Sequence, residues 1–109
     1  MHILLVCTGN TCRSPMAEAL LKGAIANSPL LANEVAVRSA GIMALEGAPA
    51  AANAKQVVKN KGLSLADHKA TQLTDELVDW ADLILVMTAS AYLQVARGFP
   101  GAVEKLHTL

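Results

Sequence analysis

Aromatic side chains are scarce in this sequence, since Trp80, Tyr92 and Phe99 are the only three among 109 residues. None lies before residue 80, so most of the chain must build its core and its binding sites from aliphatic and polar side chains. A site that sandwiches an aryl ring between aromatic side chains is therefore not expected in that part of the chain.

Cysteine and histidine are also rare, and their positions are informative. Cys7 and Cys12 are the only two cysteines and lie five positions apart, which is not the framework of a secreted, disulfide-rich protein. This usage favours a reducing compartment, so a cytoplasmic location is expected. The three histidines, His2, His68 and His107, do not stand at metal-ligand spacing, and neither a metal nor another cofactor is predicted.

An excess of one charge and a long apolar run are missing as well. Nine basic residues balance nine acidic ones, which gives no electrostatic case for a nucleic-acid or membrane partner. No run of about 18 apolar residues occurs and no basic leader precedes the first apolar run, so neither a spanning helix nor a secretory signal is expected. With 53% hydrophobic residues the chain can bury a core, and its length fits one domain, 1–109.

The stretch that organises the sequence is the loop Cys7–Ser14, CTGNTCRS. It follows the apolar run His2–Val6, a predicted buried strand, and it precedes Pro15–Lys22, a predicted helix with proline in its first turn. Unpaired backbone N–H groups and the positive end of the helix dipole converge where a strand, a loop and a helix start meet. This arrangement predicts an oxyanion site.

The side chains of this loop suit nucleophilic chemistry. A thiol at Cys7 would lie in the positive field of the helix start, which favours the reactive thiolate. The Arg13 guanidinium is placed to hold two oxygens of a tetrahedral anion, and the Ser14 hydroxyl to donate to the sulfur. Gly9 allows close approach of the backbone to the anion, and Asn10 tolerates a left-handed turn. We therefore predict Cys7, Arg13 and Ser14 as catalytic residues. The predicted anion-binding residues are Thr8, Gly9, Asn10, Thr11, Cys12 and Arg13.

Each catalytic assignment has a plainer alternative. Cys7 is alternatively an inert buried thiol at the end of a core strand. Arg13 is alternatively one partner of a surface salt bridge. Ser14 is alternatively a helix cap, a role that is compatible with donation to the sulfur.

Strand and helix signals alternate through the rest of the chain. Further strands are predicted at Val35–Gly41, Asp82–Met87 and Ala102–His107, and further helices at Pro49–Lys61, after Thr74 as N-cap, and at Ala89–Arg97. Apolar strands that alternate with helices indicate an α/β fold with a parallel sheet covered on both faces. The ligand site of such sheets lies beyond the carboxyl ends of the strands, where the Cys7 loop is placed.

The longer string Val6–Glu18, VCTGNTCRSPMAE, resembles the low-molecular-weight protein tyrosine phosphatase family, and within it most closely the bacterial protein-arginine phosphatase branch. The resemblance implies a single three-layer domain with a four-stranded parallel sheet in the order 2-1-3-4, flanked by helices. It also implies a phosphorylated protein as substrate, phosphate in the loop, a cysteinyl-phosphate intermediate and no metal or other cofactor.

Further roles follow from the same resemblance. Ser39 and His68 resemble family residues that hydrogen-bond the loop asparagine, here Asn10, and support its strained conformation. The family is known for a redox-protective disulfide onto the nucleophile, which a cysteine at Cys12 would close onto Cys7. The alternatives are an exposed loop histidine for His68 and a small core residue beneath the loop for Cys12.

Thr11 stands where the tyrosine-specific enzymes of the family carry isoleucine. Its smaller apolar volume and its hydroxyl suit a polar, planar guanidinium better than an aryl ring, so phosphoarginine is the preferred substrate and Thr11 the predicted selector. The loop after the second strand offers Ile42–Leu45 where those relatives place an aromatic residue. A protein tyrosine phosphatase is the alternative, with Thr11 as a plain loop residue and Met43 as a flexible wall.

The carboxyl end departs from the family pattern. Family members continue through an Asp-Pro loop that supplies the general acid, and no Asp-Pro dipeptide occurs in these 109 residues. The general acid is therefore unknown, and the C-terminal part of the family domain is expected to be absent. A second alternative follows, in which the chain is an inactive oxyanion-binding or redox-sensing module. The oligomeric state is not predicted.

Overall fold

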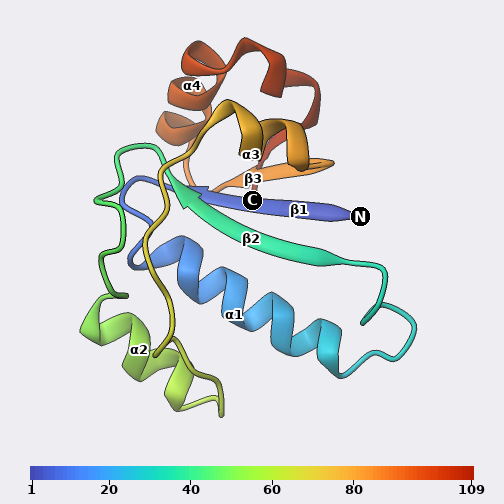
Figure 1. The fold of residues 1–109 in the computed structure, drawn as a ribbon, viewed down its shortest axis with the longest axis vertical. Helices are drawn as coiled ribbons and strands as arrows, with labels where there is room; N and C mark the ends of the chain where they lie inside the picture. The colour runs from blue at the N-terminus through green and yellow to red at the C-terminus, as the bar shows by residue number, and fades with distance from the viewer.

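A four-stranded sheet lies at the centre of the computed structural model, which describes residues 1–109 (Figure 1). The strands are β1 His2–Cys7, β2 Ala36–Gly41, β3 Leu83–Val86 and β4 Leu106–Thr108, in the order β2-β1-β3-β4. All three neighbouring pairs are parallel, so each connection between paired strands crosses a face of the sheet. The predicted α/β fold and strand order are confirmed.

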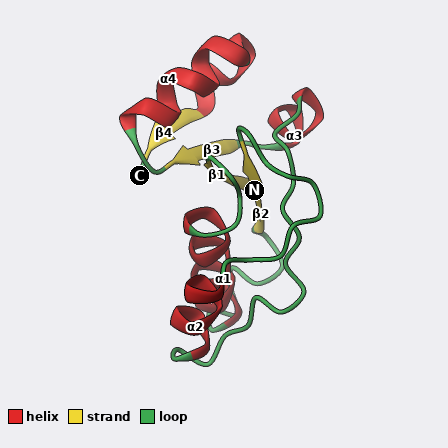
Figure 2. Ribbon diagram, turned by 90° about the vertical axis from the view of Figure 1, so that its left-hand side faces the viewer, coloured by secondary structure: helices red, strands yellow, loops and turns green.

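Helices cover both faces of the sheet, as a parallel sheet requires. α1 Arg13–Ala26 and α2 Ala52–Lys59 lie on one side, and α3 Asp75–Trp80 and α4 Ala89–Gly98 lie on the other (Figure 1, Figure 2). A short 3-10 helix, Pro100–Lys105, follows α4 and leads into β4. None of these helices is long and apolar enough to span a membrane.

The side chains of the central strands alternate between the two helical layers. One face of the sheet is covered by α3 and α4. The fully buried residues of β1 and β3 on this face are Leu4, Val6, Ile84 and Val86. Leu5 points to the opposite face, where it packs with Ile25 of α1 and Val37 of β2. Because β1 is buried on both faces, the position of its carboxyl end is fixed by the core.

The last predicted strand, Ala102–His107, is wrong over most of its length. Pro100–Lys105 forms the 3-10 helix, and only Leu106–Thr108 joins the sheet. Pro100 has a fixed φ and no N–H to donate to a ladder, which favours a turn at this point. The fully buried Ala102 then donates its backbone N–H to Phe99 O, so its apolar character reflects packing and not a strand.

The helix predicted at Pro49–Lys61 is shorter at both ends. Pro49 forms an isolated antiparallel bridge with Lys69, which keeps it outside the helix. α2 therefore begins at Ala52 and ends at Lys59, and the turn that follows reaches Gly62, whose φ of 76° is positive. Glycine accepts this left-handed conformation at little cost, so Gly62 closes the segment as predicted.

The single tryptophan lies at the end of β1 opposite to Cys7. The ring of His2 stacks on Trp80 with 4.3 Å between the ring centroids, and the Arg38 guanidinium lies 4.6 Å from the Trp80 centroid. Tyr92 and Phe99 pack against the core beneath α4. All three aromatic residues therefore serve the scaffold.

Asp82 lies at the same end of the sheet, and its pKa carries a prediction. The backbone N–H of His2 donates to the Asp82 carboxylate over 2.8 Å, and this bond, with the nearby positive charges, lowers the pKa of Asp82. A lowered pKa stabilises the fold above the ordinary pKa of aspartate, and that stabilisation is lost as the pH falls through the lowered value.

We expect Asp82→Asn to be modestly less stable than the wild type at neutral pH, because the carboxylate is exposed to solvent. The difference in the free energy of unfolding should shrink as the solution is acidified, and urea unfolding at a series of pH values measures it. A difference that stays constant across the acid range would contradict the assignment.

Candidate active site

The Cys7 loop lies between the carboxyl end of β1 and the start of α1. Cys7 is the last residue of β1 and pairs in register with Gly41, the last residue of β2. α1 begins at Arg13, and Cys12 at its N-cap position makes no side-chain capping bond. The positive end of a 14-residue helix is therefore directed at the loop, which suits an oxyanion.

Two hydrogen-bond partners surround the sulfur of Cys7. Ser14 Oγ lies 2.9 Å from Cys7 Sγ, and the backbone N–H of Asn10 donates to Cys7 Sγ over 3.3 Å. Cys7 is 9% exposed, so the sulfur is shielded from bulk water but not sealed. Ser14 lies inside the first turn of α1, and its hydroxyl is directed at the sulfur instead of capping the helix. Donors placed in this way stabilise negative charge on sulfur.

Asn10 has a φ of 56° and is the only residue other than glycine with a positive φ. His68 Nε2 donates to Asn10 O over 2.7 Å, and because a carbonyl only accepts, Nε2 carries the proton. The backbone N–H of Thr71 donates to Asn10 Oδ1 over 2.8 Å. Asn10 Nδ2 donates to both Ser14 Oγ and Ser39 Oγ, each over 2.9 Å. The structure therefore brings His68 and Ser39 onto the loop asparagine.

The buried polar residues of the chain all belong to this network. Asn10, Ser14 and Ser39 are the only polar side chains classed as buried, and no buried side-chain nitrogen or oxygen lacks a partner. A fully satisfied buried network holds one geometry, because any rotation would leave a polar atom unpaired. The loop is thus held rigidly in a backbone conformation that is uncommon for a residue other than glycine.

Gly41 is a site residue that the sequence reasoning missed. A Cβ atom at this position would lie 2.7 Å from Thr8 O and 2.9 Å from Asn10 N, both of them backbone atoms. The loop therefore packs directly on the Gly41 backbone, which also accepts from Leu73 N–H and donates to Thr71 O. The glycine that ends the second strand was the available signal.

The loop forms one wall of an open cavity of about 350 Å³. The cavity is lined by Cys7, Thr8, Gly9, Thr11, Cys12, Arg13, Met87, Thr88 and Ala91. No aromatic residue contributes to this lining. A larger cavity of about 600 Å³ lies beside β2 and does not contain Cys7.

Arg13 lies at the rim of the cavity that contains Cys7. It is exposed and takes part in no ion pair, since the only ion pair in the chain joins Lys22 to Glu18. The alternative role of Arg13 in a surface salt bridge is therefore not observed. Its guanidinium is available for an anion in the cavity.

Cys12 has contacts that fit both of its predicted roles. It lines the cavity that contains Cys7, and it also packs against the cluster formed by Ala50, Ala54 and Val58 beneath the loop. Both cysteines are free thiols. No three side chains among His, Cys, Asp and Glu converge on a point that would hold a metal ion.

Glu18 was also missed as part of the network. Ser39 Oγ donates to Glu18 Oε1, and Lys22 Nζ donates to Glu18 Oε2 over 2.6 Å. The signal was the spacing from Ser14, because residues four positions apart in a helix share a face. Thr71 acts through its backbone N–H, which no side-chain pattern reveals.

The fold and the loop define a class of protein, an α/β domain that places a cysteine thiol at the N-terminus of its first helix. A family model described as low molecular weight phosphotyrosine protein phosphatase matches residues 2–109. The chain belongs to this family.

Its relatives carry two kinds of name. A protein-arginine-phosphatase of Geobacillus stearothermophilus is 48% identical over 108 residues, which are 99% of this chain and 68% of the relative. A probable low molecular weight protein-tyrosine-phosphatase, EpsP of Ralstonia solanacearum, is 46% identical, over 98% of this chain and 69% of the relative. The solved YwlE arginine phosphatase from Geobacillus stearothermophilus superposes with a TM-score of 0.88 at 46% identity, over 98% of this chain and 65% of that one. The chain thus spans about two thirds of the length of the relatives it matches.

Proposed function

We propose that this protein is a phosphatase in which the Cys7 thiolate is the nucleophile. The observation that carries the proposal is the placement of Cys7 Sγ, which lies 2.9 Å from Ser14 Oγ and 3.3 Å from Asn10 N at the mouth of a helix N-terminus. Hydrogen-bond donors and a helix dipole at one sulfur favour thiolate, the form that attacks phosphorus.

The reaction follows from the positions of these groups. The Cys7 thiolate attacks phosphorus in line, an S–P bond forms, and the bond from phosphorus to the leaving group breaks. The loop amides and the Arg13 guanidinium bind the three equatorial oxygens, where charge develops. Ser14 stabilises the sulfur as it attacks and as it leaves. Water then cleaves the S–P bond, which releases phosphate and restores the thiolate. The group that protonates the leaving group is not assigned.

Phosphoarginine in proteins is the substrate that we propose. The cavity at Cys7 is lined by no aromatic residue, and Thr11 at its wall carries a hydroxyl that suits a guanidinium. The relative from Geobacillus stearothermophilus is named an arginine phosphatase, which supports the same choice. Phosphotyrosine is the second candidate, because the relative from Ralstonia solanacearum is named a tyrosine phosphatase at similar identity.

A third candidate is an inactive oxyanion-binding or redox-sensing module. Cys7 and Cys12 line one cavity as free thiols, which is the observation behind a redox role. We also propose that the partner is a phosphorylated protein and that the location is cytoplasmic.

The test compares two phosphopeptides of otherwise identical sequence, one with phosphoarginine and one with phosphotyrosine. We expect phosphate release from both, with the larger kcat/KM for phosphoarginine. A larger value for phosphotyrosine would establish the second candidate. Binding of inorganic phosphate without release from either peptide would establish the third.

Thr11→Ile is expected to move the preference toward phosphotyrosine. The ethyl group that replaces the hydroxyl fills the cavity wall, so the ratio of the two kcat/KM values should change on the order of tenfold. Thr11→Val is the matched control, because it removes the hydroxyl and keeps the volume. An unchanged ratio in Thr11→Ile would remove Thr11 as the selector, and equal shifts in both variants would assign the selection to the hydroxyl alone.

A further inference from the structure

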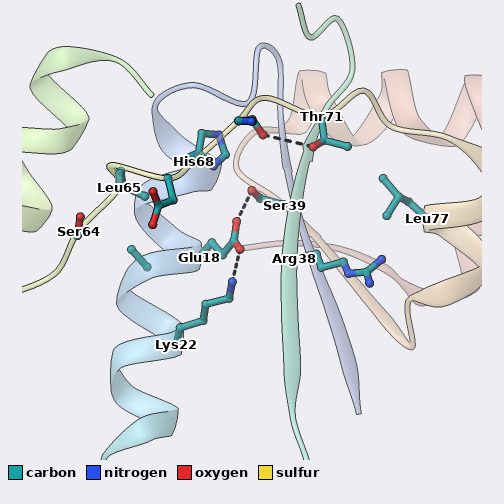
Figure 3. A pocket seen from close by; sticks show the side chains of 12 residues that line it. Glu18, Lys22, Arg38, Ser39, Ser64, Leu65, His68, Thr71 and Leu77 are labelled. Carbon is teal, nitrogen blue, oxygen red and sulfur yellow. Dashed lines mark hydrogen bonds and ion pairs between the residues drawn. The ribbon is translucent and has the colours of Figure 1, made fainter. Parts of the chain in front are cut away.

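Glu18 lies in the wall of the larger cavity, on the face of α1 that continues from Ser14. Figure 3 shows its carboxylate between Ser39 and Lys22, with a bond to each. Its side chain is only 17% exposed. A largely shielded carboxylate with two donors is tied to the catalytic loop, although it does not line the cavity that contains Cys7.

The direction of each hydrogen bond between Glu18 and Ser14 is determined by the donors available. The N–H of Thr71 donates to Asn10 Oδ1, which fixes which end of the asparagine amide is oxygen and which is nitrogen. Asn10 Nδ2 has two protons, and it donates one to Ser14 Oγ and one to Ser39 Oγ. Both hydroxyl oxygens therefore act as acceptors toward Asn10.

Each hydroxyl has one proton left to place. The Glu18 carboxylate only accepts, so Ser39 directs its proton to Glu18 Oε1. Ser14 receives the other N–H of Asn10, and toward a Cys7 thiolate, which only accepts, it donates its own proton over 2.9 Å. The bonds run outward from the Asn10 amide and end on two acceptors, the Glu18 carboxylate and the Cys7 sulfur.

We propose that Glu18 is a positioning residue, whose carboxylate anchors Ser39 and Asn10 so that Ser14 is held as a donor to Cys7. The inference rests on the proposed function, in which Cys7 acts as a thiolate. Hydrogen bonds in such a chain polarise one another, and an acceptor for the Ser39 proton at the far end fixes the order of the whole chain.

The charged groups near the two ends are few. Lys22 binds the Glu18 carboxylate, and Arg38, Asp67, His68 and Lys69 line the same cavity. On the other side, Arg13 is the one charged residue that lines the cavity with Cys7. Lys22 is well exposed, so solvent screens its effect on Glu18.

The test is the rate of alkylation of Cys7 by iodoacetamide against pH, with the label located on Cys7 and not Cys12 by fragmentation of the N-terminal peptide. This reaction reports thiolate and needs no phosphatase activity, so it separates failure of this inference from failure of the proposed function. Glu18→Met keeps the length of the side chain without an acceptor, and Glu18→Gln keeps an amide oxygen that still accepts from Ser39.

In Glu18→Met we expect alkylation at neutral pH to slow between about threefold and tenfold, with the plateau rate at high pH unchanged. The Ser39 proton then has no acceptor on residue 18, and the order of the hydrogen bonds that hold Ser14 is weakened. Glu18→Gln should stay within about twofold of the wild type. Lys22→Met removes the ion pair and leaves the bond from Ser39, so its alkylation rate should also stay within about twofold of the wild type. In a Ser39→Ala background, Glu18→Met should add no further loss, because the path to Asn10 is already interrupted.

Wild-type alkylation profiles in Glu18→Met would overturn the inference. Equal decreases in the alkylation rate of Glu18→Met and Glu18→Gln would overturn it as well. Such a result would mean that an acceptor for the Ser39 proton makes no difference. If Glu18→Met fails to fold, Glu18→Gln is compared with Lys22→Met. Slow alkylation of Cys7 in Glu18→Gln, with a normal rate in Lys22→Met, would contradict the acceptor role.

Discussion

Cys7→Ser is expected to abolish turnover, with kcat reduced on the order of 10⁴-fold or more, because a serine hydroxyl stays protonated where a thiol ionises. The amides of the loop, the start of α1 and Arg13 are untouched by the change. Binding of inorganic phosphate should therefore survive within a few-fold. Steady-state phosphate release and isothermal titration with phosphate measure the two quantities.

The two measurements together identify the role of Cys7. Loss of turnover with retained anion binding assigns the sulfur to the chemical step. Loss of both would indicate that the exchange has disturbed the buried network around Ser14, which a thermal unfolding curve of the variant reveals. Turnover close to that of the wild type would end the assignment of Cys7 as nucleophile.

Gly41→Ala is expected to have the second largest effect. The added Cβ would lie 2.7 Å from Thr8 O, and because that neighbour is backbone, the loop must move to make room. Overpacking of this kind costs about 1–3 kcal/mol of stability. Since the atoms displaced belong to the loop that we propose binds the anion, we expect both phosphate binding and turnover to be largely lost even where the variant stays folded.

Gly98→Ala is the matched control for this variant. Gly98 is the last residue of α4, and a Cβ atom there meets nothing within 4 Å. We expect its stability and phosphate affinity to equal those of the wild type or slightly exceed them, since alanine favours helix over glycine. Phosphate affinity in Gly41→Ala equal to that of Gly98→Ala would show that the loop does not depend on a bare backbone at Gly41.

The sequence predicted the sheet because its strands are short apolar runs bounded by turn residues, and β1 and β3 stand out clearly in that respect. It placed Cys7, Arg13 and Ser14 in one loop because they lie within eight consecutive residues. It failed at Ala102–His107, where apolar side chains serve packing around a turn that Pro100 begins.

Contacts between segments far apart in the sequence were not predicted from local sequence patterns. The close packing of Gly41 on the loop, the backbone N–H of Thr71 and the bond from Ser39 to Glu18 depend on how the elements are arranged in space. No local pattern encodes such contacts. Ser39 and His68 were reached only through a family resemblance, which carries that spatial information indirectly.

The hydrogen bonds of Asn10 bear on the order in which the protein folds. Three of these hydrogen bonds reach partners 29, 58 and 61 residues away, namely Ser39, His68 and Thr71. Because closing loops of this length costs chain entropy that local contacts do not, we expect these bonds to form after the nearby helices. The surroundings of the Cys7 sulfur should then be complete only when the chain has condensed as far as residue 71. The rate at which Cys7 is labelled during refolding should therefore report tertiary assembly, whereas helical circular dichroism should report earlier events.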